Sequence, residues 1–279
     1  MSARADADAD ADAEAAAGRV GVRVRELATT AELAECSRLL QRVWRAEHPA
    51  EIASPSMLRT WVHSGNYVSG AYRGDVLVGT AVGFLGLDGE HVHLHSHLAG
   101  VERGGHGHGH GVGYALKLHQ RAWTLARGLA EVHWTFDPLI LRNAYFNLQK
   151  LGAAAVEYLP EFYGAMTDGI NSGDLTDRIL VVWRLDRPPG PAAAPDAGAA
   201  VPLVSRTADG RPETHDAPAC AAVLSVAVPA DAEGLRAADR EAALAWRVAV
   251  RDALMGRLAA GYRITAMTRD GRYLLERAA

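Results

Sequence analysis

A glycine- and histidine-rich segment occupies residues 101–113, with the sequence VERGGHGHGHGVG, and a helix-forming run follows it directly. A strand, a glycine-rich turn and a helix in that order direct backbone N–H groups to one point, where the positive end of the helix dipole adds to them. Such a point suits a phosphate or pyrophosphate group. Because glycine-rich turns also serve as ordinary strand-to-helix connections, the segment alone leaves both interpretations open.

Histidines gather before and inside this segment. Alternate positions of a predicted strand carry four of them, His91, His93, His95 and His97, and the loop carries three more, His106, His108 and His110. Side chains at alternate strand positions share one face, so these imidazoles could hold zinc or nickel. However, no carboxylate or cysteine completes a recognisable ligand spacing. We therefore predict no dedicated metal site and regard a solvated strand face as the simpler interpretation.

Hydrophobic patterns and turn residues define the elements that position these groups. A helix capped by Thr29 or Thr30 runs to about Arg45, with one apolar face made of Leu33, Cys36, Leu40, Val43 and Trp44. A shorter helix begins at Ser54 or Ser56. The predicted strands are 20–27, 67–72, 76–84, 91–101, 131–136, 153–158 and 179–185, and the later helices are 112–127 and 141–151. This order predicts an α/β (α+β) fold with a mixed, mostly antiparallel sheet flanked by helices.

Composition divides the chain into four parts. Residues 1–17 are an acidic Ala/Asp tail that we expect to be disordered, and residues 18–186 form the main domain. Residues 187–200 are a Pro/Ala linker, and residues 201–279 form a smaller C-terminal β-α-β-β unit. The predicted helix of that unit runs from about 234 to 260. A unit of this size buries little apolar surface by itself, so we expect it to pack on the main domain.

The charge balance and the cysteines narrow the class of protein. The formal charge is −4, with 33 acidic and 29 basic side chains, and gives no reason to expect nucleic acid or an anionic membrane as partner. No apolar run is long enough to cross a membrane, and the acidic N-terminus is not a secretion signal. Two distant cysteines, Cys36 and Cys220, indicate free thiols in a reducing compartment. We expect a cytoplasmic protein whose oligomeric state, a homodimer included, stays open.

Over residues 20–186 the chain resembles the GNAT acyltransferase superfamily. The resemblance rests on the element order, on the glycine turn, and on the strings HSHLAGV (95–101), WTFDPL (134–139), RNAYFNLQKLGA (142–153) and FYGAMTDGINSGDLTDR (162–178). These strings look like one branch of uncharacterised acetyltransferases, and the C-terminal unit resembles the tail of that branch. The resemblance implies an acyl-CoA donor, usually acetyl-CoA, held between the fourth and fifth strands, and an amine acceptor.

The resemblance also implies which residues bind the donor. Backbone N–H groups from Leu98 to Val101 would polarise the thioester carbonyl. The pyrophosphate would be held by the loop and the helix start, through Gly109, Gly111, Val112 and Gly113. Asn143 and Asn147 lie four apart on one helix and could bind the pantetheine arm or the acceptor, although Asn143 could equally cap the helix.

The sequence departs from the superfamily pattern at two positions. His108 stands where a Gln or Arg usually helps to hold the loop, in a Gly-His repeat that looks expanded. Leu148 stands where many relatives have a tyrosine that acts as general acid. Leucine has no proton to give, so catalysis needs another donor or none.

Amine acetylation requires a base that removes a proton from the ammonium group. His97, at the end of the fourth strand, is the first candidate and His95 the second, while the alternative is a structural histidine bonded to the backbone. Tyr163, or else Tyr145, could protonate the leaving thiolate, but each could simply be a core or rim aromatic. Asp137 could point into the opening or form an Asx turn, and Asp177 with Arg178 could form a buried pair.

We therefore predict an acyl-CoA-dependent N-acetyltransferase that moves acetyl directly from acetyl-CoA to an amine, without a covalent enzyme intermediate and without a metal. One alternative is a non-catalytic acyl-CoA binding or sensing module on the same fold. A second alternative is a histidine-based metal-binding protein.

Overall fold

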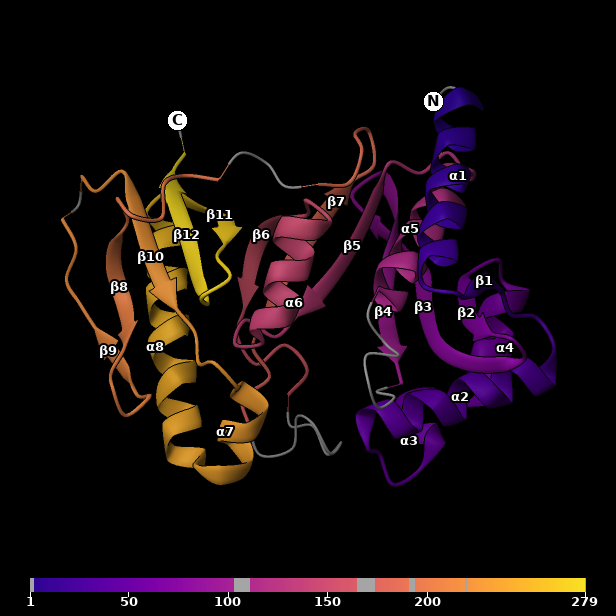
Figure 1. Cartoon of the computed structure of the whole chain (residues 1–279), viewed down its shortest axis with the longest axis horizontal. Coiled ribbons are helices and arrows are strands. Elements are labelled where there is room, and N and C mark those ends of the chain that lie inside the picture. The colour runs from indigo at the N-terminus through magenta and orange to yellow at the C-terminus, as the bar shows by residue number, and fades with distance from the viewer. Residues whose placement is uncertain (1–2, 103–110, 165–173, 191–193, 219, 279) are drawn as a thin grey trace. The chain divides into compact units, whose positions relative to one another are not determined.

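A computed structural model of the chain (Figure 1) describes residues 3–102, 111–164, 174–190, 194–218 and 220–278. The chain divides into two compact units. Of the described residues, the first unit comprises 3–102, 111–133 and 184–186, and the second comprises 134–164, 174–183, 187–190, 194–218 and 220–278. The division falls inside strand β5 (Glu131–Phe136) and not at the Pro/Ala segment 187–200, which differs from the boundary expected from composition.

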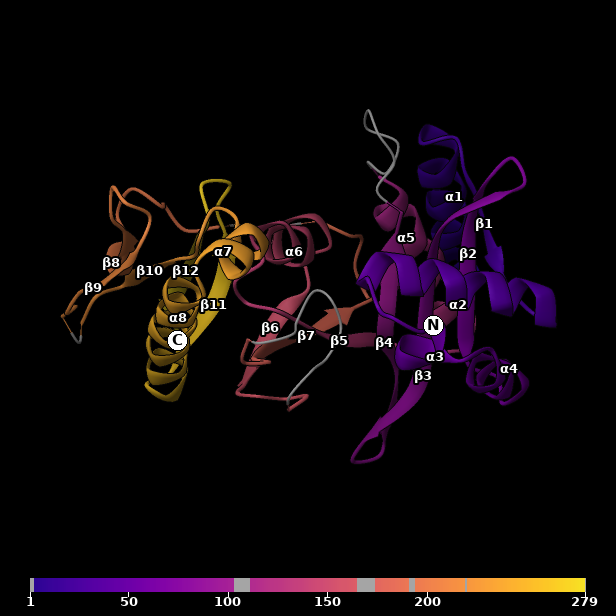
Figure 2. The ribbon, with the colours of Figure 1, turned by 90° about the horizontal axis from the view of Figure 1, so that it is seen from below.

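The sheet of the first unit is an antiparallel meander to which one parallel strand is added. Its strands are β1 (Arg23–Glu26), β2 (Tyr67–Arg73), β3 (Val76–Asp88), β4 (His91–Val101) and the start of β5. Neighbours from β1 to β4 are antiparallel, whereas β4 and β5 are parallel. The expected mixed, mostly antiparallel sheet is thus confirmed. β3 and β4 form a long hairpin whose closed end projects from the unit (Figure 2), and β2 pairs with it only as far as Gly83.

Helices α2 (Thr30–Trp44) and α5 (Val112–Leu125) cover opposite faces of this sheet. Thr80 of β3 lies against α2, since its Oγ1 is 3.1 Å from Cys36 Sγ. The preceding residue, Gly79, faces α5, because a Cβ there would lie 3.2 Å from the side chains of Val112 and Leu116. Successive strand residues point to opposite faces, so the two helices lie on opposite sides. The short helices α3 (Pro49–Ala53) and α4 (Pro55–His63) pack beside α2.

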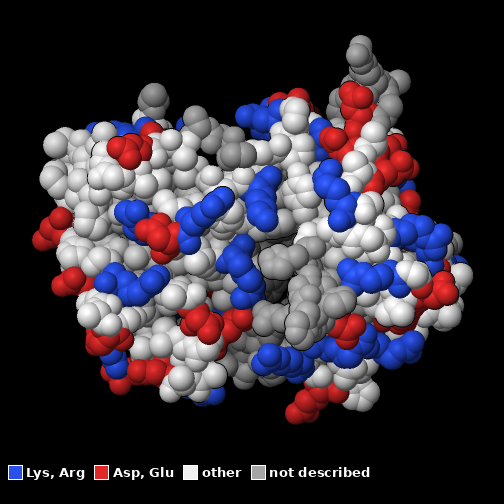
Figure 3. All heavy atoms as spheres, in the orientation of Figure 1, with Lys and Arg blue, Asp and Glu red and all other residues white. Residues whose placement is uncertain are grey.

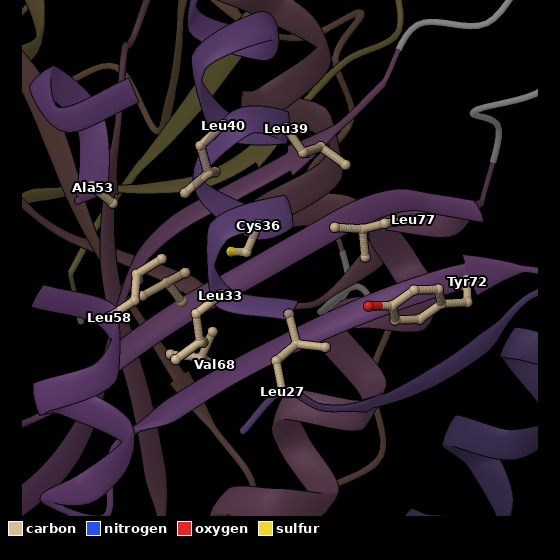
Figure 4. Packing of buried hydrophobic residues seen from close by; sticks show 11 residues of the cluster. Leu27, Leu33, Cys36, Leu39, Leu40, Ala53, Leu58, Val68, Tyr72 and Leu77 are labelled. Atoms are coloured by element: carbon tan, nitrogen blue, oxygen red, sulfur yellow. The ribbon is translucent and has the colours of Figure 1, made fainter. Parts of the chain in front are cut away.

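The core between α2 and the sheet follows the predicted helix face (Figure 4). Thr29 caps α2 in a reciprocal capping box with Glu32, as the sequence predicts. Leu33, Cys36 and Leu40 have no exposed surface and pack in one cluster with side chains of α4, β2 and β3. Each buried leucine of this kind stabilises the fold by about 2 kcal/mol.

The N-terminal Ala/Asp segment is helical, which corrects the prediction that residues 1–17 are disordered. Helix α1 (Ala3–Arg19) packs against α5. Its buried residues are Ala9, Ala13, Ala16 and Ala17. This spacing places them on one helical face, and their small side chains let α5 approach. The prediction failed because low-complexity composition concealed a helical period.

The second unit contains the rest of β5. In the strand order, β5 is followed by β7 (Arg178–Arg184) and then by β6 (Ala154–Leu159). The predicted helix 141–151 consists of an α-helical turn, α6 (Leu141–Tyr145), followed by a π-helical turn, η1 (Phe146–Lys150). π-Turns are rare and are often found at functional sites.

The C-terminal part of the second unit has a five-stranded sheet in the order β11-β12-β10-β8-β9. The predicted strand and hairpin are β10 (Val223–Ala227), β11 (Tyr262–Met267) and β12 (Arg272–Arg277), and the prediction missed β8 (Val201–Arg206) and β9 (Pro212–Thr214). Asp239 divides the predicted helix into α7 (Ala232–Ala238) and α8 (Arg240–Ala259), because its side chain accepts the N–H of Ala242 and caps α8.

Buried ion pairs join these C-terminal helices to the segments around β5 and β7. Asp137, directly after β5, pairs with Arg236 and Arg247. Both arginines also pair with Asp174. Asp137 and the residues next to it in sequence therefore belong to the same unit as α7 and α8. This explains why the division of the chain does not follow the linker.

The predicted pair of Asp177 with Arg178 is not formed. Its carboxylate accepts hydrogen bonds from Arg251 of α8 at 2.8 and 2.5 Å and from the Tyr158 hydroxyl at 2.7 Å. Arg178 instead donates to the backbone carbonyl of Asp177. Neighbours in a strand point to opposite faces, so adjacent side chains rarely meet.

None of the helices in the described part of the chain combines the length and the apolar character needed to cross a bilayer.

Candidate functional site

Strand β4 carries a bulge at His97. In its pairing with β3, Leu98 lies opposite Val82 and Ser96 lies opposite Gly83, so His97 is the extra residue. The bulge shifts by one residue the alternation of side chains between the two faces of the sheet. As a result, Leu98 packs against the core cluster next to α2. Only the backbone of Leu98 is therefore free to serve a ligand.

The parallel pairing of β4 with β5 is short. It joins Leu94 to Val132 and His95 to His133. β4 continues to Val101, and among the described residues no further β5 partner is paired with it. Beyond His95, one edge of β4 thus offers backbone groups that the sheet does not use on that side.

The N-terminus of α5 lies beside the end of β4. Gly111 is the N-cap residue, with φ +86° and ψ −16° and no side-chain cap. A Cβ at Gly111 would lie 2.6 Å from Val20 Cγ1, so both the backbone conformation and the space require glycine. A Cβ at Gly113 would lie 3.9 Å from Val101 Cγ2.

Four of the predicted donor-binding residues are therefore neighbours at this helix start: Val101, Gly111, Val112 and Gly113. The first N–H groups of α5 have no side-chain cap and are suited to an anion. Gly109, His108 and the other loop histidines lie outside the described residues.

The imidazole of His97 lies in a group of aromatic rings. Its centroid is 6.1 Å from the Trp61 ring and 5.8 Å from the Phe84 ring. His95 stacks on Phe84 at 4.9 Å, with 25° between the planes. None of the described residues forms a hydrogen bond with a ring nitrogen of His95 or His97.

Burial keeps these imidazoles neutral. It lowers the pKa of His97 from the ordinary 6.5. Burial, together with the nearby bases His97, His93, His133 and Lys117, lowers the pKa of His95 to about 4. Both rings are thus unprotonated at neutral pH and can accept a proton.

His93 forms a stacked pair with His133 of β5, with centroids 3.8 Å apart and 16° between the planes. His133 Nε2 is 2.9 Å from Glu131 Oε2. Stacked rings direct their nitrogen lone pairs side by side and not to a common point, which does not suit a shared metal ion. Within the described residues, no group of three or more His, Cys, Asp or Glu side chains is arranged to hold one.

A buried lysine that sequence reasoning missed lies under β4 on the α5 side. Lys117 Nζ donates to Ser96 Oγ at 2.8 Å and to Gln120 Oε1 at 3.0 Å. Burial lowers the pKa of Lys117 to about 7. Ser96 is next to the bulge residue, so this hydrogen bond holds β4 where His97 leaves the pairing. An isolated lysine in an amphipathic helix carries no signal that it faces the sheet.

The remaining predicted site residues lie in the second unit. The Tyr163 hydroxyl is 3.1 Å from Thr135 Oγ1, and its ring lies 5.1 Å from the Arg178 guanidinium carbon. Asn147 is buried in η1, whereas Asn143 is exposed. The N-cap of α6 is Ile140 without a side-chain cap, so Asn143 does not cap the helix.

Leu148 and Asp137 also lie in this unit. Leu148 is buried in η1, with 4% of its surface exposed. Asp137 forms the simpler of its two predicted arrangements, an Asx turn, in which Oδ1 accepts the N–H of Leu139 at 2.9 Å.

A hollow of about 450 Å³ lies over α6 and η1, where basic side chains gather on the face shown in Figure 3. Its lining residues are Leu141, Arg142, Tyr145, Phe146, Lys150 and Arg269. Arg142 is paired with Glu233 by two hydrogen bonds of 2.8 Å, and Arg269 donates to the Tyr145 hydroxyl at 3.1 Å. Both predicted tyrosines thus have a hydrogen-bond partner, and the choice between Tyr163 and Tyr145 as proton donor stays a prediction.

No family model and no curated protein matches the sequence. The chain is similar to the aminoglycoside 6'-N-acetyltransferase from Enterococcus faecium (16% identity, TM-score 0.43, 62% of this chain and 99% of that chain). It is similar to the ribosomal-protein-S18-alanine N-acetyltransferase from Escherichia coli (15% identity, TM-score 0.45, 63% and 97%). A third match is the acetyltransferase of the GNAT family from Streptococcus pneumoniae (13% identity, TM-score 0.44, 58% and 98%). All three are acetyltransferases.

Proposed function

We propose that this protein is an acyl-CoA-dependent N-acetyltransferase that transfers acetyl from acetyl-CoA directly to an amine. The observation that carries the proposal is the geometry of β4, which leaves its parallel partner after His95 and bulges at His97. It then ends beside an uncapped helix N-terminus. One strand thereby offers a neutral base, free backbone donors and an anion site in sequence.

The donor would be held by its phosphates and its carbonyl. The N–H groups at the start of α5, from Gly111 to Gly113, would bind the pyrophosphate. N–H groups of β4 between Leu98 and Val101 would donate to the thioester oxygen, where negative charge develops during the reaction. Asn143 and Asn147 stay predictions for the pantetheine arm.

The reaction would begin with proton transfer from the acceptor ammonium to an unprotonated nitrogen of His97. The freed amine nitrogen then attacks the thioester carbonyl carbon, forming the C–N bond and a tetrahedral oxyanion that the β4 donors stabilise. Collapse of this species breaks the C–S bond, and the electron pair leaves with sulfur as a thiolate. After the C–N bond forms, the nitrogen still carries a second proton, which passes through water to the departing thiolate, so the products are the N-acetylated amine and CoA-SH. His97 returns the first proton to solvent, and Tyr163 as proton donor stays a prediction.

Titration of acetyl-CoA into the full chain by calorimetry, after metal removal, tests the donor site, with free CoA alongside. We expect saturable micromolar binding of both, because both carry the pyrophosphate. If neither produces heat nor raises the melting temperature, the proposal fails. Release of CoA-SH with a panel of amines then tests transfer.

Leu148 favours a second candidate, a non-catalytic acyl-CoA binding module. A buried leucine in η1 offers no proton to a leaving thiolate. Tight acetyl-CoA binding without CoA-SH release by any amine would support this candidate. Leu148→Tyr separates the two, because a rise in turnover would show that the missing acid limits an active enzyme.

The protein's environment is part of the proposal. Both cysteines are free, Cys36 buried and Cys220 exposed, which fits a reducing compartment such as the cytoplasm. We also propose that residues 201–279 are an integral part of the protein and not a separate module. Arg236 and Arg247 bind Asp137, which lies 99 and 110 residues earlier in the sequence. Arg251 binds Asp177, which lies 74 residues earlier.

A further inference from the structure

Four rings from three elements of the first unit form a continuous surface, which we call the aromatic wall. It consists of Trp61 of α4, Phe84 of β3, and His95 and His97 of β4. Trp61 and Phe84 are 5.5 Å apart at their centroids, and the two histidine rings are 6.3 Å apart. The wall includes His97, the proposed base, so an amine that reacts there must lie against these rings.

All four rings are half-buried, so each keeps part of its surface open to solvent. Phe84 and His95 are paired at the base of the projecting β3–β4 hairpin, just beyond the last residue paired with β2. A purely structural cluster at such a position would satisfy its polar atoms internally. Here no described residue forms a hydrogen bond with the ring nitrogens of His95 or His97, so these nitrogens are available to a ligand or to water.

Among the described residues, bases are the charged or titratable groups that act most strongly on His95 of the wall. They are His97, His93, His133 and Lys117. Two described carboxylates act on the neighbouring His93: Glu131, which is engaged with His133, and Asp88, next to the turn of the hairpin. An acceptor with several ammonium groups would meet neutral rings and bases instead of carboxylates.

We infer that the acceptor is an aralkylamine: a flat aromatic body that packs against Trp61 and Phe84 and carries a single amino group directed to His97. This inference rests on the proposed function, because it names the acceptor of the same site. Aromatic faces attract both flat rings and one nearby ammonium group, while a neutral imidazole takes up the proton.

Binding of three amines to the full chain tests the acceptor class, measured at pH 7.5 by titration calorimetry and by saturation-transfer NMR in the presence of free CoA. Tryptamine carries one charge and a flat ring, n-butylamine carries one charge without a ring, and spermidine is a polycation. We expect tryptamine to bind about tenfold more tightly than n-butylamine, as stacking and cation–π contacts of this kind provide. Equal or tighter binding of n-butylamine or spermidine overturns the inference.

Substitution of the wall tests its location. Trp61→Leu keeps the site apolar but removes a ring, and we expect tryptamine affinity to fall about five- to tenfold. Phe84→Leu provides a second variant if Trp61→Leu does not fold, as judged by its melting temperature. The matched control is Phe162→Leu in the second unit, whose ring is 46% exposed and outside the wall. The same loss in the control as in the wall variants contradicts the inference.

Acetyl-CoA titration of the same preparations separates this inference from the proposed function. If acetyl-CoA binds and tryptamine does not, the acceptor class is wrong and the donor site stands. If tryptamine binds in a Trp61-dependent way and acetyl-CoA does not, the aromatic site stands and the acetyltransferase proposal falls.

Discussion

Asp137 and Arg247, 110 residues apart in sequence, form a buried two-point ion pair, with Arg247 nitrogens 2.8 and 3.1 Å from the two carboxylate oxygens. Arg247 has no exposed surface. Burial alone would raise the pKa of Asp137, but the charges and hydrogen bonds of Arg247 and Arg236 hold it well below its usual range. The pair connects the end of β5 to α8 inside the second unit.

Asp137→Asn should destabilise the protein by about 3 kcal/mol, because it leaves the buried guanidinium groups of Arg236 and Arg247 with Asp174 as their shared carboxylate. Urea unfolding followed by circular dichroism measures the change. The matched control is Arg142→Met, which breaks the exposed pair with Glu233 in the same unit and should cost less than about 1 kcal/mol. A similar loss for both variants would contradict a special role for the buried pair.

Gly111→Ala should weaken acetyl-CoA binding about tenfold or more, because the new Cβ would meet Val20 and displace the N-terminus of α5. The left-handed backbone, with φ +86°, adds a cost to stability of about 1–2 kcal/mol. Calorimetry and thermal unfolding measure the two effects separately.

Gly65→Ala is the control for this variant. Gly65 has φ +80° but no atom within 4 Å of the added Cβ, so it should show the backbone cost without the loss of affinity. Unchanged acetyl-CoA affinity in Gly111→Ala would argue against a donor site at this helix.

His97→Gln should lower the turnover number about a hundredfold while leaving acetyl-CoA affinity nearly unchanged, because it removes a general base and not a donor contact. Since burial lowers the pKa of His97 below 6.5, the wild-type rate should increase as pH rises through that lowered value and be level at neutral pH. His48→Gln, at an exposed position, should leave both properties unchanged. Full turnover in His97→Gln would transfer the role to His95 or to water.

Protonation of His95 should destabilise the fold in mildly acidic solution. Its pKa is about 4 in the folded protein and near 6.5 when unfolded, so the unfolded chain binds more protons between these values. The free energy of unfolding should therefore fall as pH decreases from 6.5 to 4, by about 1–2 kcal/mol after allowance for partial exposure. His95→Gln should flatten the curve of unfolding free energy against pH in this window. The lowered pKa of Asp137 affects stability only at lower pH. Its contribution to the free energy of unfolding is lost as pH falls below the ordinary aspartate pKa.

The sequence by itself determined many of the local elements, including those that carry the predicted donor-binding residues. Strong local signals sufficed for α2 with its Thr29 cap, for the β2–β3 hairpin, and for the glycine at the start of α5. Each of these depends on residues within one turn or one strand of each other. The choice of His97 as base stays a prediction, made from its place near the end of the fourth strand.

Only the tertiary structure decided how distant or ambiguous side chains are used. Four alanines made α1 a helix because α5 is present to cover them, and the bulge at His97 depends on a register that only the β3 partner fixes. Asp177 chose Arg251 over its neighbour Arg178, and Trp61 came to lie beside His97, through packing of segments far apart in the chain. Such choices follow from the free energy of burial and pairing across the fold, which local sequence patterns do not contain.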